Sequence, residues 1–144
     1  GSPAALQGRE QLTTIPSTKI AAAAAYKMAG ITAKDVDFAE VHDCFTVAEV
    51  VDSEDLGFFE KGTGATAARN GDTKLNGSIS INPSGGLKSK GHPIGATGVG
   101  QVVEAFEQLT GKSGERTVND AKIGLTQNFG ATGASCAVHI FQSV

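Results

Sequence analysis

Residues 82–98 read NPSGGLKSKGHPIGATG and join an alternating strand pattern, 78–81, to an apolar helical pattern that ends near Gly111. The five glycines of this stretch let the backbone bend and let another molecule approach, because a residue without Cβ reaches positive φ at little cost. Pro93 suits the first turn of a helix, which places His92 at a helix entrance. The unpaired amides there disfavour an imidazolium, so we expect a neutral histidine that can take up a proton. The stretch is interpreted as an active-site loop. A glycine-rich loop that only connects two elements is an alternative of about equal weight.

The composition is that of an ordinary globular domain. The chain has 144 residues, of which 40% are hydrophobic and 19% charged, with a formal net charge of −3. No basic footprint and few aromatic residues are present, so nucleic acid is not an expected partner. No apolar run reaches the roughly 18 residues of a membrane span, so a membrane is not expected either. We expect one domain over residues 1–144, with 1–11 as a lead-in that opens on a tag-like Gly1-Ser2.

The two cysteines, Cys44 and Cys136, are far apart and lack CxxC spacing. Neither a zinc ribbon nor a disulfide framework is indicated, and a reducing, cytoplasmic location fits best. Cys136 falls in a strand pattern and is interpreted as a small buried hydrophobe. His139, in the same strand pattern, is likewise expected to be structural.

The first half of the chain predicts a helix, a strand and a second helix. The first helix should begin at an N-cap, Ser17 or Thr18, and stop at Gly30. Its apolar face is expected to pack in the core and comprises Ile20, Ala23, Ala24 and Met28. Residues 36–41 follow as a strand that runs into His42-Asp43-Cys44-Phe45, and Thr46 with Glu49 then matches a capping box. Residues 57–77 lack an apolar period and are expected to form a long functional or mobile loop.

The second half predicts a helix with an apolar face and a strand pair. The helical face comprises Val99, Val102, Val103, Phe106 and Leu109. Residues 123–126 and 136–141 are expected to be antiparallel strands at one edge of the sheet. The order αβαβαββ predicts a layered α/β domain with a mixed sheet and helices packed on it. Because such a unit normally opens on a strand, part of the sheet is expected to belong to residues outside this chain.

Three loops carry reactive or glycine-rich sequence, 42–45, 88–98 and 127–133, and we expect them to meet on one face of the domain. A thiol, two imidazoles and exposed amides are the groups needed for acyl chemistry through an enolate. For Cys44, a buried packing role competes with a reactive thiol whose pKa is depressed at a helix start. A zinc site from the side chains of 42–44 and His92 is the less favoured alternative, because a tetrahedral site needs four converging ligands.

These loops resemble one enzyme family closely. HDCF at 42–45, GHPIGATG at 91–98 and NFGATG at 128–133 are similar to the C-terminal half of a thiolase, in the sterol-carrier-protein-type and archaeal branch that carries HDCF. The resemblance runs from about Leu12 to Phe141. It implies a C-terminal thiolase-like domain that is incomplete without its N-terminal half.

The resemblance also implies an acyltransferase reaction, in which acyl-CoA thioesters are condensed or cleaved through an acyl-cysteine. His92 would activate the nucleophilic cysteine and hold the thioester oxyanion, and His42 would position a water in that oxyanion hole. Cys44 would be the acid/base thiol that moves the α-proton. The backbone amide of Gly130 would serve a second oxyanion hole.

Ser84, Gly85 and Gly86 are expected to contact the coenzyme A substrate. No bound cofactor or metal is expected beyond the coenzyme A thioesters themselves.

Two departures from the family pattern set the expected partners. Asn128 stands where other thiolases carry the cysteine of a CxG motif, which leaves the acid/base role to Cys44. The nucleophilic cysteine belongs to the N-terminal half, so we expect the chain to be inactive alone, to need that half, and to act within a homo-oligomer of the full enzyme. The alternative is a non-thiolytic relative, either aldolase-type or an acyl-CoA-binding or assembly subunit.

Overall fold

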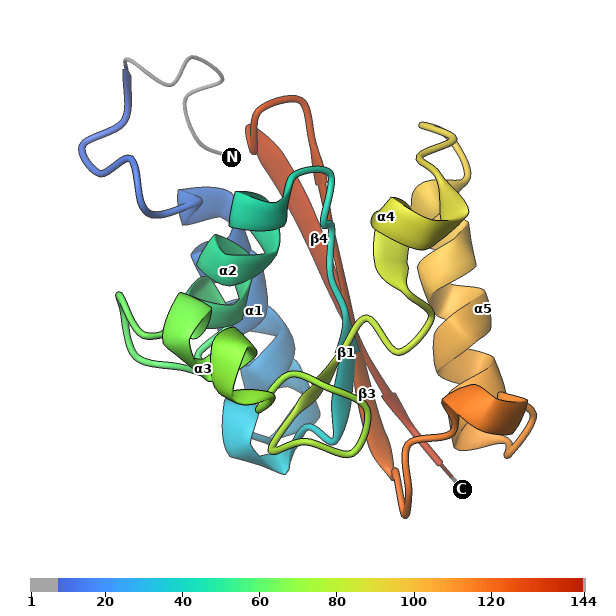
Figure 1. Ribbon diagram of the computed structural model, residues 1–144. Coiled ribbons are helices and arrows are strands. Elements are labelled where there is room, and N and C mark those ends of the chain that lie inside the picture. Colours follow the sequence, from blue (N-terminus) through green and yellow to red (C-terminus); the bar gives the residue numbers. More distant parts are fainter. Residues whose placement is uncertain (1–7, 144) are drawn as a thin grey trace.

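The computed structural model describes residues 8–143 (Figure 1), so residues 1–7 of the expected lead-in lie outside the described residues. The helices are α1 (Pro16–Ala29), α2 (Thr46–Asp55), α3 (Gly64–Asn70), α4 (Gly86–Lys90) and α5 (Thr97–Leu109), with short 3-10 turns at Ala33–Asp35 and Gly114–Arg116. The strands are β1 (Phe38–Glu40), β2 (Ser80–Ile81), β3 (Ile123–Gly130) and β4 (Ser135–Gln142). The predicted order of helices and strands is confirmed, with two additional helices, α3 and α4.

The strands form one mixed sheet in the order β2-β1-β3-β4. β1 pairs in parallel with both β2 and β3, whereas β3 and β4 form the antiparallel pair that the sequence predicts. The carboxyl ends of β1, β2 and β3 therefore lie at one end of the sheet. The loops that carry His42, His92 and Gly130 leave the sheet from that end.

The sheet is the middle of three layers, with α1, α2 and α3 on one face and α4 and α5 on the other (Figure 1). On the α1 side the core contains Ala39, Val41, Leu56 and Leu125, each at most 1% exposed. On the α5 side a smaller cluster contains Phe38, Ala105 and Val118. Gly124 has no side chain because any Cβ there would collide with the Phe38 ring. Both faces of β1 are thus buried, as expected for the parallel part of a sheet.

The first helix forms where predicted but turns its apolar stripe outward. Pro16 is its first residue, Ile15 precedes it as N-cap, and Gly30 ends it in the left-handed conformation. Ile20 is 60% exposed and Met28 88% exposed. The prediction that this stripe packs in the core is wrong, because the helix instead buries Ser17, Thr18 and Ala22 against the sheet and α2.

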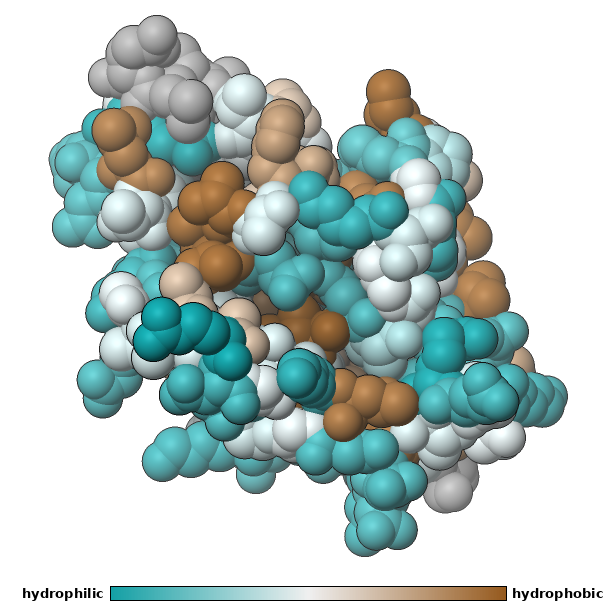
Figure 2. Space-filling view, in the orientation of Figure 1, coloured by the Kyte–Doolittle hydropathy of each residue, from teal (hydrophilic) through white to brown (hydrophobic). Residues whose placement is uncertain are grey.

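The fifth helix shows the same inversion more strongly. Its exposed face carries Val99, Val102, Val103 and Phe106, and hydrophobic side chains are visible on this side of the molecule in Figure 2. Its buried face carries Thr97, Gln101, Glu104, Ala105 and Gln108. Of the predicted apolar face, only Leu109 packs in the core, against the cluster of Phe38, Ala105 and Val118, and the other four side chains are exposed among residues 8–143.

Three local predictions are corrected. Thr46 is the first residue of α2 and makes no capping hydrogen bond, and Glu49 accepts from the Asn82 side chain instead of closing a capping box. Residues 57–77 contain α3, which ends at Gly71 in the left-handed conformation. The helix after the GHP motif begins at Thr97 and not at Pro93, whose carbonyl accepts from the Thr97 amide in an intervening turn.

Candidate active site

A cavity of about 620 Å³ opens at the carboxyl end of the sheet. Its walls come from the loop after β1, the GHP loop, the end of β3 and the start of β4. The lining residues are His42, His92, Ile94, Asn128, Phe129, Gly130, Ala131, Ser135, Cys136 and Ala137. The three loops that the sequence singles out therefore do meet on one face of the domain.

The histidine of the GHP motif is held in place by Thr97. Thr97 Oγ1 lies 2.7 Å from His92 Nδ1 and 3.3 Å from the Pro93 carbonyl oxygen. When the Thr97 hydroxyl donates to that carbonyl, the Thr97 oxygen accepts from His92 Nδ1. With the hydrogen on Nδ1, Nε2 of His92 carries the lone pair. A nitrogen in that state can take a proton from a thiol and can afterwards donate it as a hydrogen bond.

His42 lies against His92 and is fixed by a neighbour on β3. The two imidazole rings meet edge to face, with centroids 4.9 Å apart and planes at 84°. His42 Nδ1 is bonded to the side-chain oxygen of Asn128, which can only accept, so Nε2 of His42 also carries a lone pair. Burial, together with the neighbouring His92, lowers the pKa of His42, although the bond to Asn128 opposes this shift. His42 is only 4% exposed and is kept neutral to lower pH than a free histidine.

Cys44 lies one layer behind the cavity. It packs against the hydrophobic cluster of Ile15, Ala48 and Phe129, and Phe129 is the member of that cluster that lines the cavity. Burial raises the pKa of the Cys44 thiol, so the thiol is protonated at neutral pH. The sequence argument that a helix start depresses this pKa is not confirmed, because desolvation dominates.

Cys136, and not Cys44, is among the residues that line the cavity. The sequence analysis did not predict this. It pairs with Phe129 across the β3–β4 hairpin, and its sulfur lies 3.7 Å from Thr18 Oγ1. Burial raises its pKa as well. Its position follows from the register of the hairpin, which the sequence does not specify.

Gly130 ends β3 at the rim of the cavity. Its carbonyl accepts from the amides of Gly133 and Ala134, which closes the tight turn between β3 and β4. A side chain at Gly130 would press on the Ser135 hydroxyl. The contribution of the Gly130 amide to an oxyanion hole stays a prediction.

The residues predicted to contact coenzyme A lie in a loop that is bonded to the end of β1. Ser84 donates through its amide and its hydroxyl to the buried carboxylate of Glu40, at 3.1 and 2.7 Å. Gly86 has a φ of +63°, and a Cβ there would collide with the Asp43 carboxylate. Ser84 thus holds the loop onto the end of β1, and Gly86 lets the loop lie close to Asp43. The contact of Ser84, Gly85 and Gly86 with substrate stays a prediction.

Asp43 ties together the two loops that carry the histidines. It is 1% exposed, and its carboxylate accepts from the amides of Leu87 and Lys88, at 2.7 and 3.3 Å. These amides belong to α4, the short helix immediately before Gly91 and His92. The acidic residue of the HDCF motif therefore positions the GHP loop.

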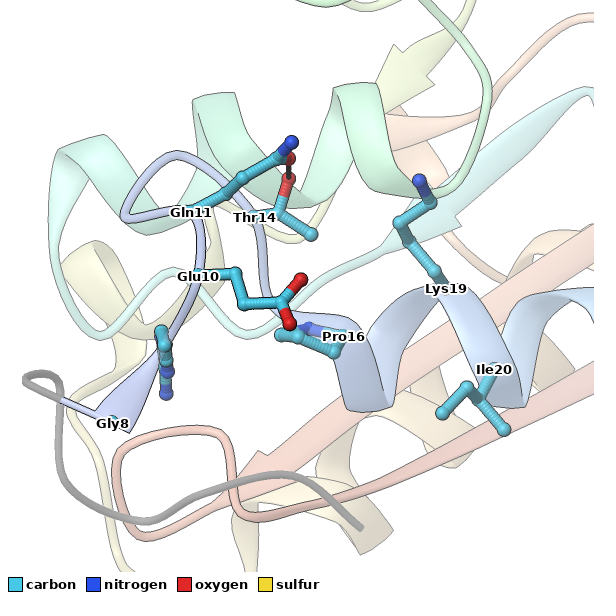
Figure 3. Close-up of a pocket in the computed structure, with 8 residues that line it drawn as sticks. Gly8, Glu10, Gln11, Thr14, Pro16, Lys19 and Ile20 are labelled. Atoms are coloured by element: carbon cyan, nitrogen blue, oxygen red, sulfur yellow. Dashed lines mark hydrogen bonds between the residues drawn. The ribbon is translucent and has the colours of Figure 1, made fainter.

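A second cavity of about 500 Å³ lies near the amino-terminal end of α1. Figure 3 shows its labelled residues, among them Glu10, Lys19 and Thr14, the last bonded to Gln11. It shares no lining residue with the histidine cavity. Within residues 8–143, no three His, Cys, Asp or Glu side chains are grouped as metal ligands would be. No helix in the same part of the chain is long and apolar enough to cross a bilayer.

The roles of Thr97 and Asn128 in the site were not predicted. Both fall inside the quoted motifs, but neither is acidic, basic or a thiol, so residue chemistry alone does not mark them. Asn128 was noted only for the thiol it lacks. Their value comes from the histidine that each contacts, and such a pairing is visible only in three dimensions.

Comparison with known proteins places the chain in a family. Residues 2–143 match the model of the family described as "Thiolase C-terminal domain-like". The chain is 51% identical over 137 residues to an acetyl-CoA acetyltransferase of Methanothermobacter thermautotrophicus, covering 95% of this chain and 36% of that protein. It is 47% identical over 117 residues to human sterol carrier protein 2, covering 81% of this chain and 21% of that protein.

Among solved structures, an Ltp2-ChsH2(DUF35) aldolase superposes with a TM-score of 0.79 over 94% of this chain and 34% of its own, at 20% identity, which shows a common fold. The chain spans about a third of the length of the archaeal relative. With the histidine pair at the carboxyl end of a mixed α/β sheet, these matches show that the chain belongs to the thiolase family and forms its C-terminal domain.

Proposed function

We propose that this domain is the C-terminal catalytic part of a thiolase, which transfers acyl groups and forms or cleaves a carbon–carbon bond between coenzyme A thioesters. The observation that carries the proposal is the edge-to-face pair of His42 and His92. Each ring has its Nδ1 engaged and its Nε2 left as the basic nitrogen, in residues that line one cavity. Two neutral imidazoles so arranged suit proton transfer beside a developing oxyanion.

His92 would act first as a base. Its Nε2 takes the proton of a cysteine thiol, and the thiolate attacks the thioester carbonyl. The imidazolium then donates from Nε2 to the carbonyl oxygen as negative charge develops there. When the tetrahedral intermediate collapses, the C–S bond to coenzyme A breaks and the imidazolium gives its proton to the coenzyme A thiolate that leaves, so an acyl-cysteine and a neutral His92 remain. His42 stays neutral and accepts one hydrogen of a water through Nε2, which leaves the other hydrogen of that water to point at the same oxygen.

Cys44 would move the α-proton. In the cleavage direction, its protonated thiol gives the proton to the enolate that leaves as acetyl-CoA, and the raised pKa supports this acid form. In the condensation direction the step runs in reverse, and the Cys44 thiolate that remains after protonation of the enolate takes the α-proton back. The Gly130 amide is proposed to hold the enolate oxygen.

The nucleophilic cysteine is proposed to come from an N-terminal half. The chain covers 36% of the archaeal acetyl-CoA acetyltransferase, so most of that enzyme has no counterpart here. The exposed apolar face of α5 adjoins the histidine cavity, because Ile94, Asn128 and Ala137 line both this cavity and the groove along α5. We propose that the N-terminal half covers this apolar face of α5.

The test is reconstitution. The chain is co-expressed with the preceding part of the archaeal relative, and cleavage of a 3-ketoacyl-CoA by coenzyme A is followed spectrophotometrically. We expect no turnover from the chain alone and measurable turnover from the pair, lost in His92→Ala. Robust turnover by the chain alone would contradict the proposal.

A second candidate is a non-thiolytic relative of the aldolase or acyl-CoA-binding type. It is favoured by one observation, that Cys44 packs behind Phe129 and is not among the residues that line the cavity. A reconstituted pair that binds acyl-CoA but never forms an acyl-cysteine, as judged by mass spectrometry, would select this candidate.

A further inference from the structure

Gln127 is a fully buried amide that contacts the backbone of His42. It is 0% exposed and lies on β3 immediately before Asn128. Its side-chain oxygen accepts from the His42 amide at 2.9 Å, across a sequence separation of 85 residues. This hydrogen bond fixes the backbone at His42, the first residue of the HDCF loop that follows β1.

The orientation of the Gln127 amide is set by two other buried side chains. Its nitrogen donates to Thr18 Oγ1 and to Asp52 Oδ1, each at 3.0 Å, and Thr18 itself donates to Asp52 Oδ1 at 3.0 Å. Thr18 belongs to α1 and Asp52 to α2, and both are 0% exposed. A rotated amide would turn its NH₂ toward the N–H of His42, so that bond would be lost. Thr18 and Asp52 therefore hold the Gln127 amide so that its oxygen, and not its nitrogen, faces the His42 amide.

Adjacent residues of β3 hold the two ends of the same histidine. Gln127 holds the backbone of His42, and Asn128 holds its ring. The strand is itself fixed from its other face, because Gln101 of α5 donates to the Gln127 carbonyl at 2.9 Å. The ring of His42 can keep its edge-to-face contact with His92 only while both ends stay in place.

Packing alone does not explain a glutamine at this position. Burying an amide costs free energy that an apolar side chain of similar volume avoids. The hydrogen bonds of Gln127 offset that cost. They join Thr18 of α1, Asp52 of α2 and His42 after β1 to one side chain of β3.

We propose that Gln127, oriented by Thr18 and Asp52, is a positioning residue that sets the backbone of His42 and thereby places its ring against Asn128, the residue that bonds to its Nδ1. The inference rests on the proposed function of His42. It adds a residue outside the family motifs to the machinery of the site.

The first test needs no activity. The chain is labelled with ¹⁵N-histidine, and long-range NMR correlations report the tautomer of each ring. We expect His42 of the parent to be in the Nδ1–H form. Gln127→Met, similar in volume but without hydrogen bonds to offer, should populate the other tautomer or broaden the His42 signals. Thr18→Val should act in the same direction more weakly.

The matched control is Thr126→Val, the same change at a buried β3 threonine that makes no contact with His42. It should leave the His42 signals unchanged, and His139 should serve as an internal reference in the Gln127 and Thr18 variants. If Gln127→Met and Thr18→Val lower the thermal midpoint but leave the His42 tautomer as in the parent, Gln127 is only a packing residue and the inference is wrong. Should Gln127→Met fail to fold, Thr18→Val decides the question.

The second test uses the reconstituted enzyme. Gln127→Met should lower kcat about tenfold or more while KM changes little, because displacing a positioned group acts on the transition state. Equal kcat per folded molecule would overturn the inference. If the reconstituted parent has no turnover, the proposed function is refuted. The NMR result would still decide whether Gln127 positions His42, because that test needs no activity.

Discussion

At the scale of single residues, the site depends on which ring nitrogen of each histidine carries the hydrogen. Thr97 and Asn128 bond to Nδ1 of His92 and of His42, and we propose that these bonds set the two tautomers. An imidazole in the wrong tautomer presents N–H where a lone pair is needed. Two polar but uncharged side chains are therefore as necessary as the histidines.

Thr97→Val tests this dependence. Valine keeps the shape of threonine but removes the oxygen that accepts from His92 Nδ1, so His92 is free to adopt either tautomer. We expect kcat of the reconstituted enzyme to fall on the order of 10², the loss typical of a disabled general base. Thr97→Ser keeps the oxygen and should retain most of the rate. Parental activity in Thr97→Val would show that the hydroxyl does not set the tautomer.

The two cysteines provide a second test. Both have a raised pKa and pack against the cluster of Ile15, Ala48 and Phe129, but only Cys44 matches the acid/base thiol of the HDCF branch. We expect Cys44→Ala to block condensation by roughly 10² or more while acyl-enzyme formation, followed by mass spectrometry, continues. Cys136→Ala should lower the condensation rate much less. Condensation at the parental rate in Cys44→Ala would reduce Cys44 to a packing residue.

At the scale of secondary-structure elements, α5 carries a polar face inward and an apolar face outward. Gln101 uses the inward face to reach the carbonyls of β1 and β3, and Gln108 and Glu104 bind each other and Arg116. The outward face, with Val103 at 50% exposure, is not covered by any other part of residues 8–143. A helix that is apolar on its solvent side marks an interface.

Val103→Lys tests whether that interface is with the missing half. Since Val103 is exposed, we expect the free energy of unfolding of the chain to change by no more than about 0.5 kcal/mol. Complementation by the N-terminal half should be lost, because a lysine would be buried without a partner. Ile20→Lys is the matched control, at 60% exposure on α1 across the sheet, and should complement normally. Equal complementation by both variants would exclude the α5 face as the contact.

Asp52 links α1, α2 and β3, and it makes the stability of the domain depend on pH. Burial raises the pKa of Asp52 well above its usual value, which is near 3.9 in unfolded chains. Its contribution to stability is therefore complete below the unfolded pKa and is lost as pH rises through the folded pKa. Asp52→Asn keeps the oxygen that Thr18 and Gln127 contact but cannot ionise.

Urea unfolding at pH 4 and at pH 8 measures this effect. We expect Asp52→Asn to gain stability over the parent at pH 8 and to gain little or nothing at pH 4. Every other carboxylate is the same in both proteins, so the difference between the two pH values isolates Asp52. A gain of the same size at both pH values would show that ionisation of Asp52 is not the cause.

At the scale of the whole molecule, a small sheet places three loops at one end, and each loop depends on the others. Asp43 of the first loop binds the amides before the GHP motif, and Gln127 of β3 binds the first loop. The fold thus holds His42 and His92 next to each other. The apolar face of α5 and the cavity are both exposed, and we propose that both contact an N-terminal half.

The sequence by itself determined the order of the elements, the edge hairpin and the convergence of His42, His92 and Gly130. These features follow from local information, since alternation, helical period and glycine position reflect the backbone that each segment prefers. The family motifs also contain residues that line the cavity, His42, His92 and Gly130. The sequence did not reveal α4, whose five residues are too few to show a period.

Only the tertiary structure decided which face of each helix is buried. The apolar stripes of α1 and α5 predict the core when the domain is assumed complete, but both stripes face outward because the polar faces satisfy buried groups on the sheet. The histidine tautomers, the place of Cys44 behind Phe129 and the link from Gln127 to His42 depend in the same way on contacts between distant segments. A hydrogen bond across 85 residues leaves no local trace in a sequence, because its strength depends on geometry that every other element must first create.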